Sequence, residues 1–274
     1  MQVIGKSPLF IFSKVWYTIT KYLKSGFFSA DRTGQNEVTI LLYTGTGCGL
    51  NIICGHYGSG KTNVAVNLAL QSKKLHPSLE VAVADIDIVN PYFRTADAAD
   101  RLRQAGVLPL IPEFANSNVD IPSLPQHLFR LFDAGKDRRI SYVDVGGDDG
   151  AVALGMYREP IEAAGYAMLY VISMYRPLTE DPQDAALLMR EIEEASRLKC
   201  TAVVNNSSIG CETTAEDILA SVEWAHACAD TCGLPLACHS YYADLHPDLP
   251  KRFADAGLGA EMLLPMENVT KKLF

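Results

Sequence analysis

The pattern G-x-x-x-x-G-K-T is the feature that most restricts what this chain can fold into. It spans Gly55–Thr62, and the short apolar run Leu50–Cys54 comes directly before it. Residues 63–70 follow with apolar side chains at helical spacing. A buried strand, a glycine-rich turn and a helix therefore come in the order that a phosphate-binding loop requires.

The residue types in this loop suit the chemistry of phosphate binding. Glycines let backbone N–H groups point inward around phosphates, and the start of a helix adds a partial positive charge. We expect Lys61 to reach the β and γ phosphates of a nucleotide, and the Thr62 hydroxyl to bind Mg²⁺. The expected nucleotide-binding residues are Gly55, Tyr57, Gly58, Ser59, Gly60, Lys61, Thr62 and Asn63.

Acidic residues end two further apolar runs. Asp85 and Asp87 follow a predicted strand at 81–84, and Asp144 follows another at 140–143. In a parallel sheet, ligands collect at the carboxyl ends of strands. Asp85 and Asp144 are therefore expected at a metal ion together with the threonine of the loop, and Asp144 is expected to hold Mg²⁺ through water.

The run at 140–143 that leads to Asp144, with the glycines after it, resembles a Walker B strand. A backbone N–H of Gly146 or Gly147 is expected to meet the γ-phosphate and to move when that phosphate is lost. Asp148 and Asp149 are predicted to form a turn.

Strand and helix patterns alternate through the rest of the chain, which predicts an α/β fold. It is expected to be a three-layer P-loop NTPase fold with a mostly parallel central sheet. Residues 50–274 are predicted to form this nucleotide-binding domain, and residues 1–49 an N-terminal extension. Later strands are predicted at 167–173, 201–204 and 235–238, and the run at 235–238 is expected to be the last strand. Helices are predicted at 182–198, 214–232 and 247–256.

The predicted extension differs from the rest of the chain in its charge. Its first 30 residues contain four lysines and no acidic residue, and its apolar side chains recur at helical spacing, as in a basic amphipathic helix. Lysines interrupt the apolar run too often for a transmembrane span or a secretory signal. Three interpretations stay open: a dispensable segment or a start codon placed too far upstream, a helix that docks on the domain or a partner, and a helix on an anionic membrane surface.

Charge and cysteine content limit the environment and the partners. The chain carries 24 basic and 32 acidic residues, a net charge of −8, and without the first 30 residues the rest carries −12. General nucleic-acid binding is not expected of so acidic a protein, and membrane contact is expected only through residues 1–30. Seven cysteines without a C-x-x-C pair predict reduced thiols and a cytoplasmic protein. An iron–sulfur or metal role for Cys228, Cys232 and Cys238, with His226 and His239, is the alternative.

Taken together, residues 50–245 resemble the ParA/MinD/nitrogenase-iron-protein group of P-loop ATPases, the SIMIBI class. The resemblance depends on the loop at 55–62, on Asp85-Ile86-Asp87, on Asp144-Val145-Gly146-Gly147 and on a late strand that ends in Asn205. More narrowly, GHYGSGKT, DIDIVNPYFR and DVGGDD are similar to a bacterial family of ParA-like ATP-binding proteins.

The resemblance implies a role for several residues. Asp85 corresponds to a switch aspartate near Mg²⁺, and Asp87 to the aspartate that positions or activates the attacking water. Lys61 and Asp87 are therefore the expected catalytic residues. Asn205 corresponds to an asparagine that reads the adenine edge, and residues 205–208 lack the carboxylate that would recognise guanine, so ATP is favoured.

One position departs from the family pattern. His56 stands where ParA and MinD have a second lysine that reaches the nucleotide of a dimer partner. Histidine is shorter and mostly neutral at pH 7. The sequence therefore does not decide whether a homodimer of that kind forms.

Three hypotheses for function follow. The first is a Mg²⁺-dependent ATP-binding protein, a slow or partner-activated ATPase that acts as a nucleotide switch on an unidentified protein or small molecule. The second is a small-molecule kinase or ligase, with a substrate pocket in residues 91–125. The third is a scaffold or cofactor-assembly partner that does not hydrolyse nucleotide. The polar groups expected in the pocket of the second are Arg94, Glu113, Asn116 and Asp120.

Overall fold

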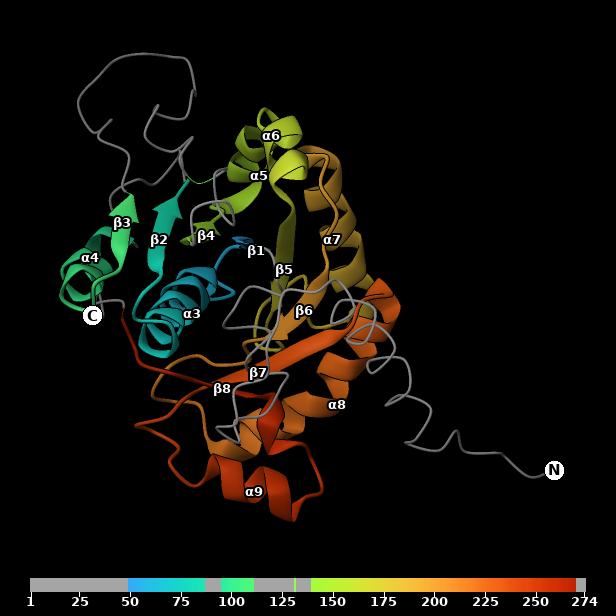
Figure 1. Ribbon diagram of the computed structural model, residues 1–274. Coiled ribbons are helices and arrows are strands. Elements are labelled where there is room, and N and C mark those ends of the chain that lie inside the picture. Colours follow the sequence, from blue (N-terminus) through green and yellow to red (C-terminus); the bar gives the residue numbers. More distant parts are fainter. Residues whose placement is uncertain (1–48, 87–94, 111–130, 132–138, 270–274) are drawn as a thin grey trace, which may run out of the picture. The chain divides into compact units, whose positions relative to one another are not determined.

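A single parallel sheet forms the centre of the computed structural model, which describes residues 49–86, 95–110, 131 and 139–269. Within these residues, eight strands pair in the order β3-β2-β4-β1-β5-β6-β7-β8, and every neighbouring pair is parallel (Figure 1). The strands are β1 (Leu50–Gly55), β2 (Glu80–Asp85), β3 (Leu108–Leu110), β4 (Arg139–Asp144), β5 (Tyr166–Ile172), β6 (Ala202–Asn205), β7 (Leu236–Tyr242) and β8 (Leu263–Met266).

Helices cover both faces of this sheet. They are α3 (Lys61–Leu75), α4 (Thr95–Gln104), α5 (Gly147–Gly155), α6 (Arg158–Ala164), α7 (Pro182–Ser196), α8 (Ala215–Cys232) and α9 (Leu249–Asp255), with a 3₁₀ turn at Ala260–Met262. The side chains of β1 show why both faces are covered, because they are apolar on both sides. Ile53 packs in one buried cluster with α3 and α4, whereas Ile52 and Cys54 pack in another with α5, α6, α7 and α8. The prediction of a three-layer α/β fold with a parallel sheet is confirmed.

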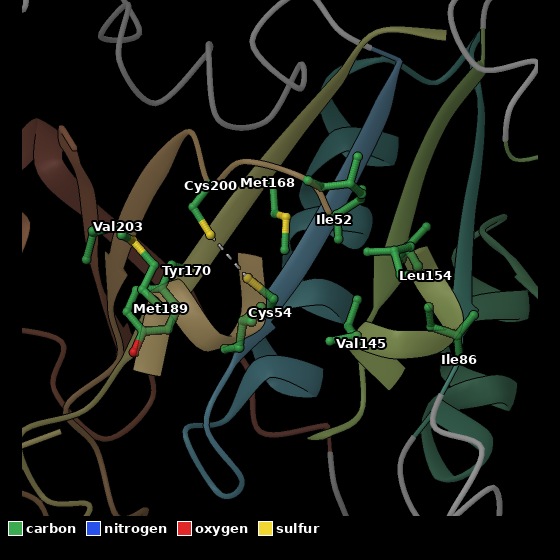
Figure 2. Packing of buried hydrophobic residues seen from close by; sticks show 14 of the residues in the cluster. Ile52, Cys54, Ile86, Val145, Leu154, Met168, Tyr170, Met189, Cys200 and Val203 are labelled. Carbon is green, nitrogen blue, oxygen red and sulfur yellow. Dashed lines mark hydrogen bonds between the residues drawn. The ribbon is translucent and has the colours of Figure 1, made fainter. Parts of the chain in front are cut away.

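Figure 2 shows the second of these clusters from close by. Cys54 at the end of β1 and Cys200 before β6 point toward each other, with their sulfur atoms 3.8 Å apart. The hydrogen bond with Cys54 and burial both raise the pKa of the Cys200 thiol, so it stays protonated at neutral pH. Both cysteines act as small apolar residues of the core, and Cys54 directly precedes the first glycine of the loop.

The sequence marks the ends of the long helices clearly. The Asp181 side chain accepts a hydrogen bond from the backbone of Gln183, and Pro182 starts α7. Thr214 and Asp217 form a reciprocal capping box at the start of α8, and Gly233 ends it in a left-handed conformation. These signals explain why the predicted limits of both helices agree with the structure to within two residues.

Two predictions from the sequence are wrong. The run 235–238 was expected as the last strand, but β7 continues to Tyr242 and β8 follows it. Asp148 and Asp149 were expected in a turn, but they lie in the first turn of α5. Acidic residues are favourable there because the start of a helix carries a partial positive charge, so the same residues fit either structure.

The backbone around β8 runs along α3 and is held by amide side chains from one face of that helix. Gln71 donates to a backbone carbonyl of β8. Asn67 exchanges two hydrogen bonds of 2.8 Å with the backbone of Glu267, and Asn63 accepts one of 3.4 Å from the backbone N–H of Val269. Because the three amides are four residues apart, they form one stripe on the helix, and the segment follows it toward the amino end of α3.

Residues 1–48 of the predicted extension lie outside the described residues, so the three interpretations of that segment stay predictions. Within the described part of the chain, no helix combines the length and the apolar character that a membrane crossing needs.

Candidate functional site

The glycine-rich loop leaves β1 at Gly55 and enters α3 at Lys61, as predicted. Gly55 has a φ of 146° and lies so close to β5 that a methyl group there would be 2.3 Å from the carbonyl oxygen of Val171. Gly60 has a φ of 84° and directly precedes α3. Neither backbone conformation suits a residue with a side chain, so the glycines of the pattern are required by the geometry of the loop.

Lys61 is folded back onto this loop. Its side chain is only 2% exposed, and its ammonium donates a hydrogen bond of 3.0 Å to the carbonyl oxygen of His56. The same carbonyl accepts the backbone N–H of Ser59 at 3.1 Å, which closes a turn inside the loop. A cation is therefore held against the backbone that would surround an anion.

The hydroxyl of Ser59 is a second sign that the loop is shaped for a ligand. This atom is buried and has no hydrogen-bond partner among the described residues. Buried polar groups are nearly always hydrogen-bonded in folded proteins. An oxygen atom of a bound phosphate is the kind of partner that such a hydroxyl lacks.

Thr62 and Asp144 meet at the start of α3. The threonine hydroxyl donates a hydrogen bond of 2.6 Å to a carboxylate oxygen of Asp144, and both residues are buried. Asp85 ends the neighbouring strand β2 and is the register partner of Asp144. A hydroxyl and two carboxylates thus lie at the ends of adjacent elements, and oxygen atoms of this kind are the ligands that Mg²⁺ prefers. Asp87 lies outside the described residues, so its role in activating water stays a prediction.

The side chain of Asn205 is part of a buried polar network. Its amide nitrogen lies 2.9 Å from both the hydroxyl of Ser221 and Nδ1 of His239. Its amide oxygen accepts the hydroxyl of Ser207 at 2.6 Å and the backbone N–H of the same residue at 3.1 Å. A contact between Asn205 and a nucleobase stays a prediction, and it would compete with these internal bonds.

Asn206 holds the loop, and sequence analysis did not single it out. Its amide nitrogen donates a hydrogen bond of 2.6 Å to the carbonyl of Ser59, and its amide oxygen accepts the hydroxyl of Ser240 at 2.6 Å. It also packs so tightly on Gly60 that a methyl group there would lie 2.1 Å from the amide nitrogen. Asn206, just beyond the end of β6, therefore ties the loop to β7.

Two other predicted binding residues differ in their surroundings. The side chain of Tyr57 is 63% exposed at the surface of the loop. The side chain of Asn63 donates a hydrogen bond of 2.9 Å to the hydroxyl of Tyr242 and also accepts the backbone of Val269. Any contact of Asn63 with nucleotide is therefore expected from its backbone N–H at the start of α3.

The cysteines proposed for an iron–sulfur or metal role lie mostly in the core. Among the described residues, no group of three or more histidine, cysteine, aspartate and glutamate side chains is placed to hold a metal ion. Burial raises the pKa of Cys228 and of Cys238 to about 12, so both thiols are protonated at pH 7. Free thiols are what the structure shows for every cysteine that it describes.

We predict that the Asn205 network makes the protein sensitive to acid. Burial, and then the nearby His226, lower the pKa of His239 to about 4, so the unfolded chain binds this proton first as the pH falls below about 6.5. This group alone should therefore reduce the free energy of unfolding by about 2 kcal/mol between pH 7 and pH 5. Urea unfolding at the two pH values checks this.

The matched control is the exposed neighbour of His239. The variant His239→Gln should lose this part of the pH dependence, whereas His226→Gln should keep most of it. An equal pH dependence in wild type and His239→Gln would show that His239 does not titrate as its burial implies.

Comparison with known proteins adds little to this geometry. No family model matches the chain, and no curated protein matches it. A solved structure that is similar is the signal recognition particle receptor FtsY from Elizabethkingia anophelis, with 17% sequence identity and a TM-score of 0.41. The alignment covers 83% of this chain and 72% of that chain. The functional assignment of the site therefore depends on the residues described above.

Proposed function

We propose that the protein binds ATP with Mg²⁺ and acts as a slow or partner-activated ATPase that switches between two nucleotide states. The observation that carries this proposal is the joint placement of the loop, Lys61, Thr62 and Asp144. A buried cation lies against the loop, and the hydroxyl of Thr62, the next residue, donates a hydrogen bond of 2.6 Å to the carboxylate of Asp144. This arrangement supports binding of a phosphate chain together with a divalent cation.

Each of these residues has a definable task in that function. The loop backbone surrounds the phosphates, and the ammonium of Lys61 exchanges the carbonyl of His56 for phosphate oxygen. Thr62 and Asp144, with Asp85 beside them, hold Mg²⁺, which neutralises charge that develops on the phosphates. Release of the terminal phosphate then changes which groups the ends of β2 and β4 contact, as a switch requires.

ATP is preferred over GTP in this proposal. Guanine is usually recognised through a carboxylate that accepts its two N–H groups. The end of β6 and the residues after it are instead Asn205, Asn206, Ser207 and Ser208. Amide and hydroxyl groups suit the edge of adenine, which offers both a donor and an acceptor.

Titration calorimetry of the whole chain tests the proposal. We expect ATP to bind in the presence of Mg²⁺, GTP to bind at least about tenfold more weakly, and turnover of bound ATP to be slow. No heat of binding with ATP and Mg²⁺ would overturn the proposed function. Rapid transfer of phosphate to one metabolite, with little hydrolysis in its absence, would favour the kinase or ligase hypothesis instead.

Removal of one metal-binding charge should separate nucleotide affinity from magnesium dependence. Asp144→Asn keeps an oxygen atom that can accept the Thr62 hydroxyl but removes the negative charge. We expect the gain in ATP affinity on addition of Mg²⁺ to be smaller in this variant than in wild type by a factor of about ten or more. The control is Asp230→Asn, the same change at an exposed position in α8. An unchanged Mg²⁺ dependence would remove Asp144 from the metal site.

A further inference from the structure

Arg176 lies against the glycine-rich loop, although it comes from the segment between β5 and α7. A methyl group on Gly58 would lie 3.1 Å from the guanidinium carbon of Arg176 and 3.2 Å from its Nε atom. Gly58 also has a φ of 78°, so both the short contact with Arg176 and the backbone conformation require glycine at this position. The guanidinium therefore fills the space where the side chain of a loop residue would be.

The segment that carries Arg176 is held firmly. The backbone N–H of Arg176 donates to the carbonyl of Ser173 at 3.3 Å. The backbone N–H of Thr179 donates to the carbonyl of Arg176 at 3.2 Å, and its hydroxyl lies 2.7 Å from the carbonyl oxygen of Ser173 and 3.1 Å from that of Arg176. The backbone N–H of Met174 donates to the hydroxyl of Ser207 at 2.9 Å, just beyond β6. The backbone that carries Arg176 is thus held in place by hydrogen bonds, and its guanidinium packs on Gly58.

Helix α8 braces the same segment from the other side. The hydroxyl of Tyr175 donates to the carbonyl of Asp217 at 3.0 Å, and the indole of Trp224 donates to the carbonyl of Glu180 at 2.7 Å. Because this backbone is already ordered, ligand binding by Arg176 does not have to order the segment, which favours affinity.

Arg176 lacks the anionic partner that a partly buried arginine normally has. Its Nε atom is buried without a hydrogen-bond partner, and no ion pair to its guanidinium occurs among the described residues. Most of the other described arginines pair with carboxylates, and the two that do not are exposed, Arg190 and Arg197. An unpaired guanidinium beside a phosphate loop is costly unless an anion completes it.

We propose that Arg176 is a phosphate-binding residue of this site, whose free N–H groups bind oxygen atoms of the nucleotide's phosphate chain. The inference rests on the proposed function and adds a second cation to the one supplied by Lys61. Guanidinium groups suit this task because their N–H groups form a planar fork that matches phosphate oxygens. The unpaired Ser59 hydroxyl lies in the same loop, so two incomplete polar groups flank Gly58.

Calorimetry with the whole chain and Mg²⁺ tests this role. Arg176→Gln should bind ATP roughly 10-fold to 100-fold more weakly than wild type, because a charge-assisted hydrogen bond is lost. The loss of affinity in Arg176→Gln should be smaller for AMP than for ATP, because AMP carries fewer phosphate charges. It should also be smaller at high salt, which screens the attraction between the guanidinium and the phosphates. Arg176→Lys should recover part of the affinity, and Arg190→Gln, at an exposed position of α7, should bind ATP as wild type does.

Two outcomes would overturn the inference without touching the proposed function. One is an Arg176→Gln protein that binds ATP as wild type does while a Lys61→Ala protein does not. The other is a loss that is the same for ATP and AMP and independent of salt, with a lowered melting temperature, because packing on Gly58 alone would then explain it. A wild-type protein that binds no nucleotide would instead refute the proposed function, and this inference with it.

Discussion

Lys61→Ala should abolish measurable nucleotide binding while leaving the protein folded. We expect the ammonium to contact both the β and the γ phosphate, so its removal should lower ATP affinity by roughly 100-fold or more. The free energy of unfolding without ligand should not fall by more than about 1 kcal/mol, because the lost hydrogen bond is offset by removal of a buried charge. Calorimetry with ATP and Mg²⁺, together with urea unfolding of the ligand-free protein, measures both quantities.

The control for this variant lies on the same helix. Lys74→Ala makes the same change in charge at an exposed position of α3 and should bind ATP as wild type does. ATP affinity within threefold of wild type in Lys61→Ala would exclude the loop as the phosphate site.

Gly55→Ala is expected to have the largest effect on stability. A methyl group at this position would lie 2.3 Å from the backbone oxygen of Val171 in β5, which cannot move without disturbing the centre of the sheet. We expect the free energy of unfolding to fall by about 3 kcal/mol or more, or the protein to become insoluble. Urea unfolding in the absence of nucleotide measures the change.

Gly233→Ala separates the clash from backbone strain. Gly233 has a φ of 70° in the left-handed region, and nothing lies within 4 Å of where its methyl group would be. Strain alone should therefore cost about 1 kcal/mol there. Equal losses in the two variants would mean that the contact between Gly55 and β5 does not limit the loop.

Local patterns in the sequence predicted most of the central sheet and the loop. The segment from β1 to α3 was predictable because a buried strand, the glycine pattern and an apolar helix follow one another directly. Asp85 and Asp144 could be placed together because parallel strands end at the same edge of a sheet. In contrast, β3 has only three residues at the edge of the sheet and gives no periodic signal.

Contacts between distant parts of the chain could not be predicted in this way. Asn205 and Asn206 are the same residue type at the end of one strand, and only the structure shows that the second of them binds the loop. Neighbouring residues of a strand point to opposite faces of the sheet, so the sequence predicts that one amide faces each way but not which of them faces the loop. Arg176 gives no signal at all in the sequence, because its role depends on a contact with Gly58 in three dimensions.

The amide stripe on α3 has a consequence for how the protein is made. The residues that Gln71, Asn67 and Asn63 bind lie 194, 200 and 206 positions further along the chain. A ribosome therefore releases α3 long before it makes the segment that covers this face, and contacts between such distant residues form slowly. The nascent chain must keep three polar amides and the adjoining helix start in water until β8 emerges. This face of α3, which begins at the loop where we propose that phosphate binds, is thus covered only late in synthesis, although the loop itself is made about 200 residues earlier.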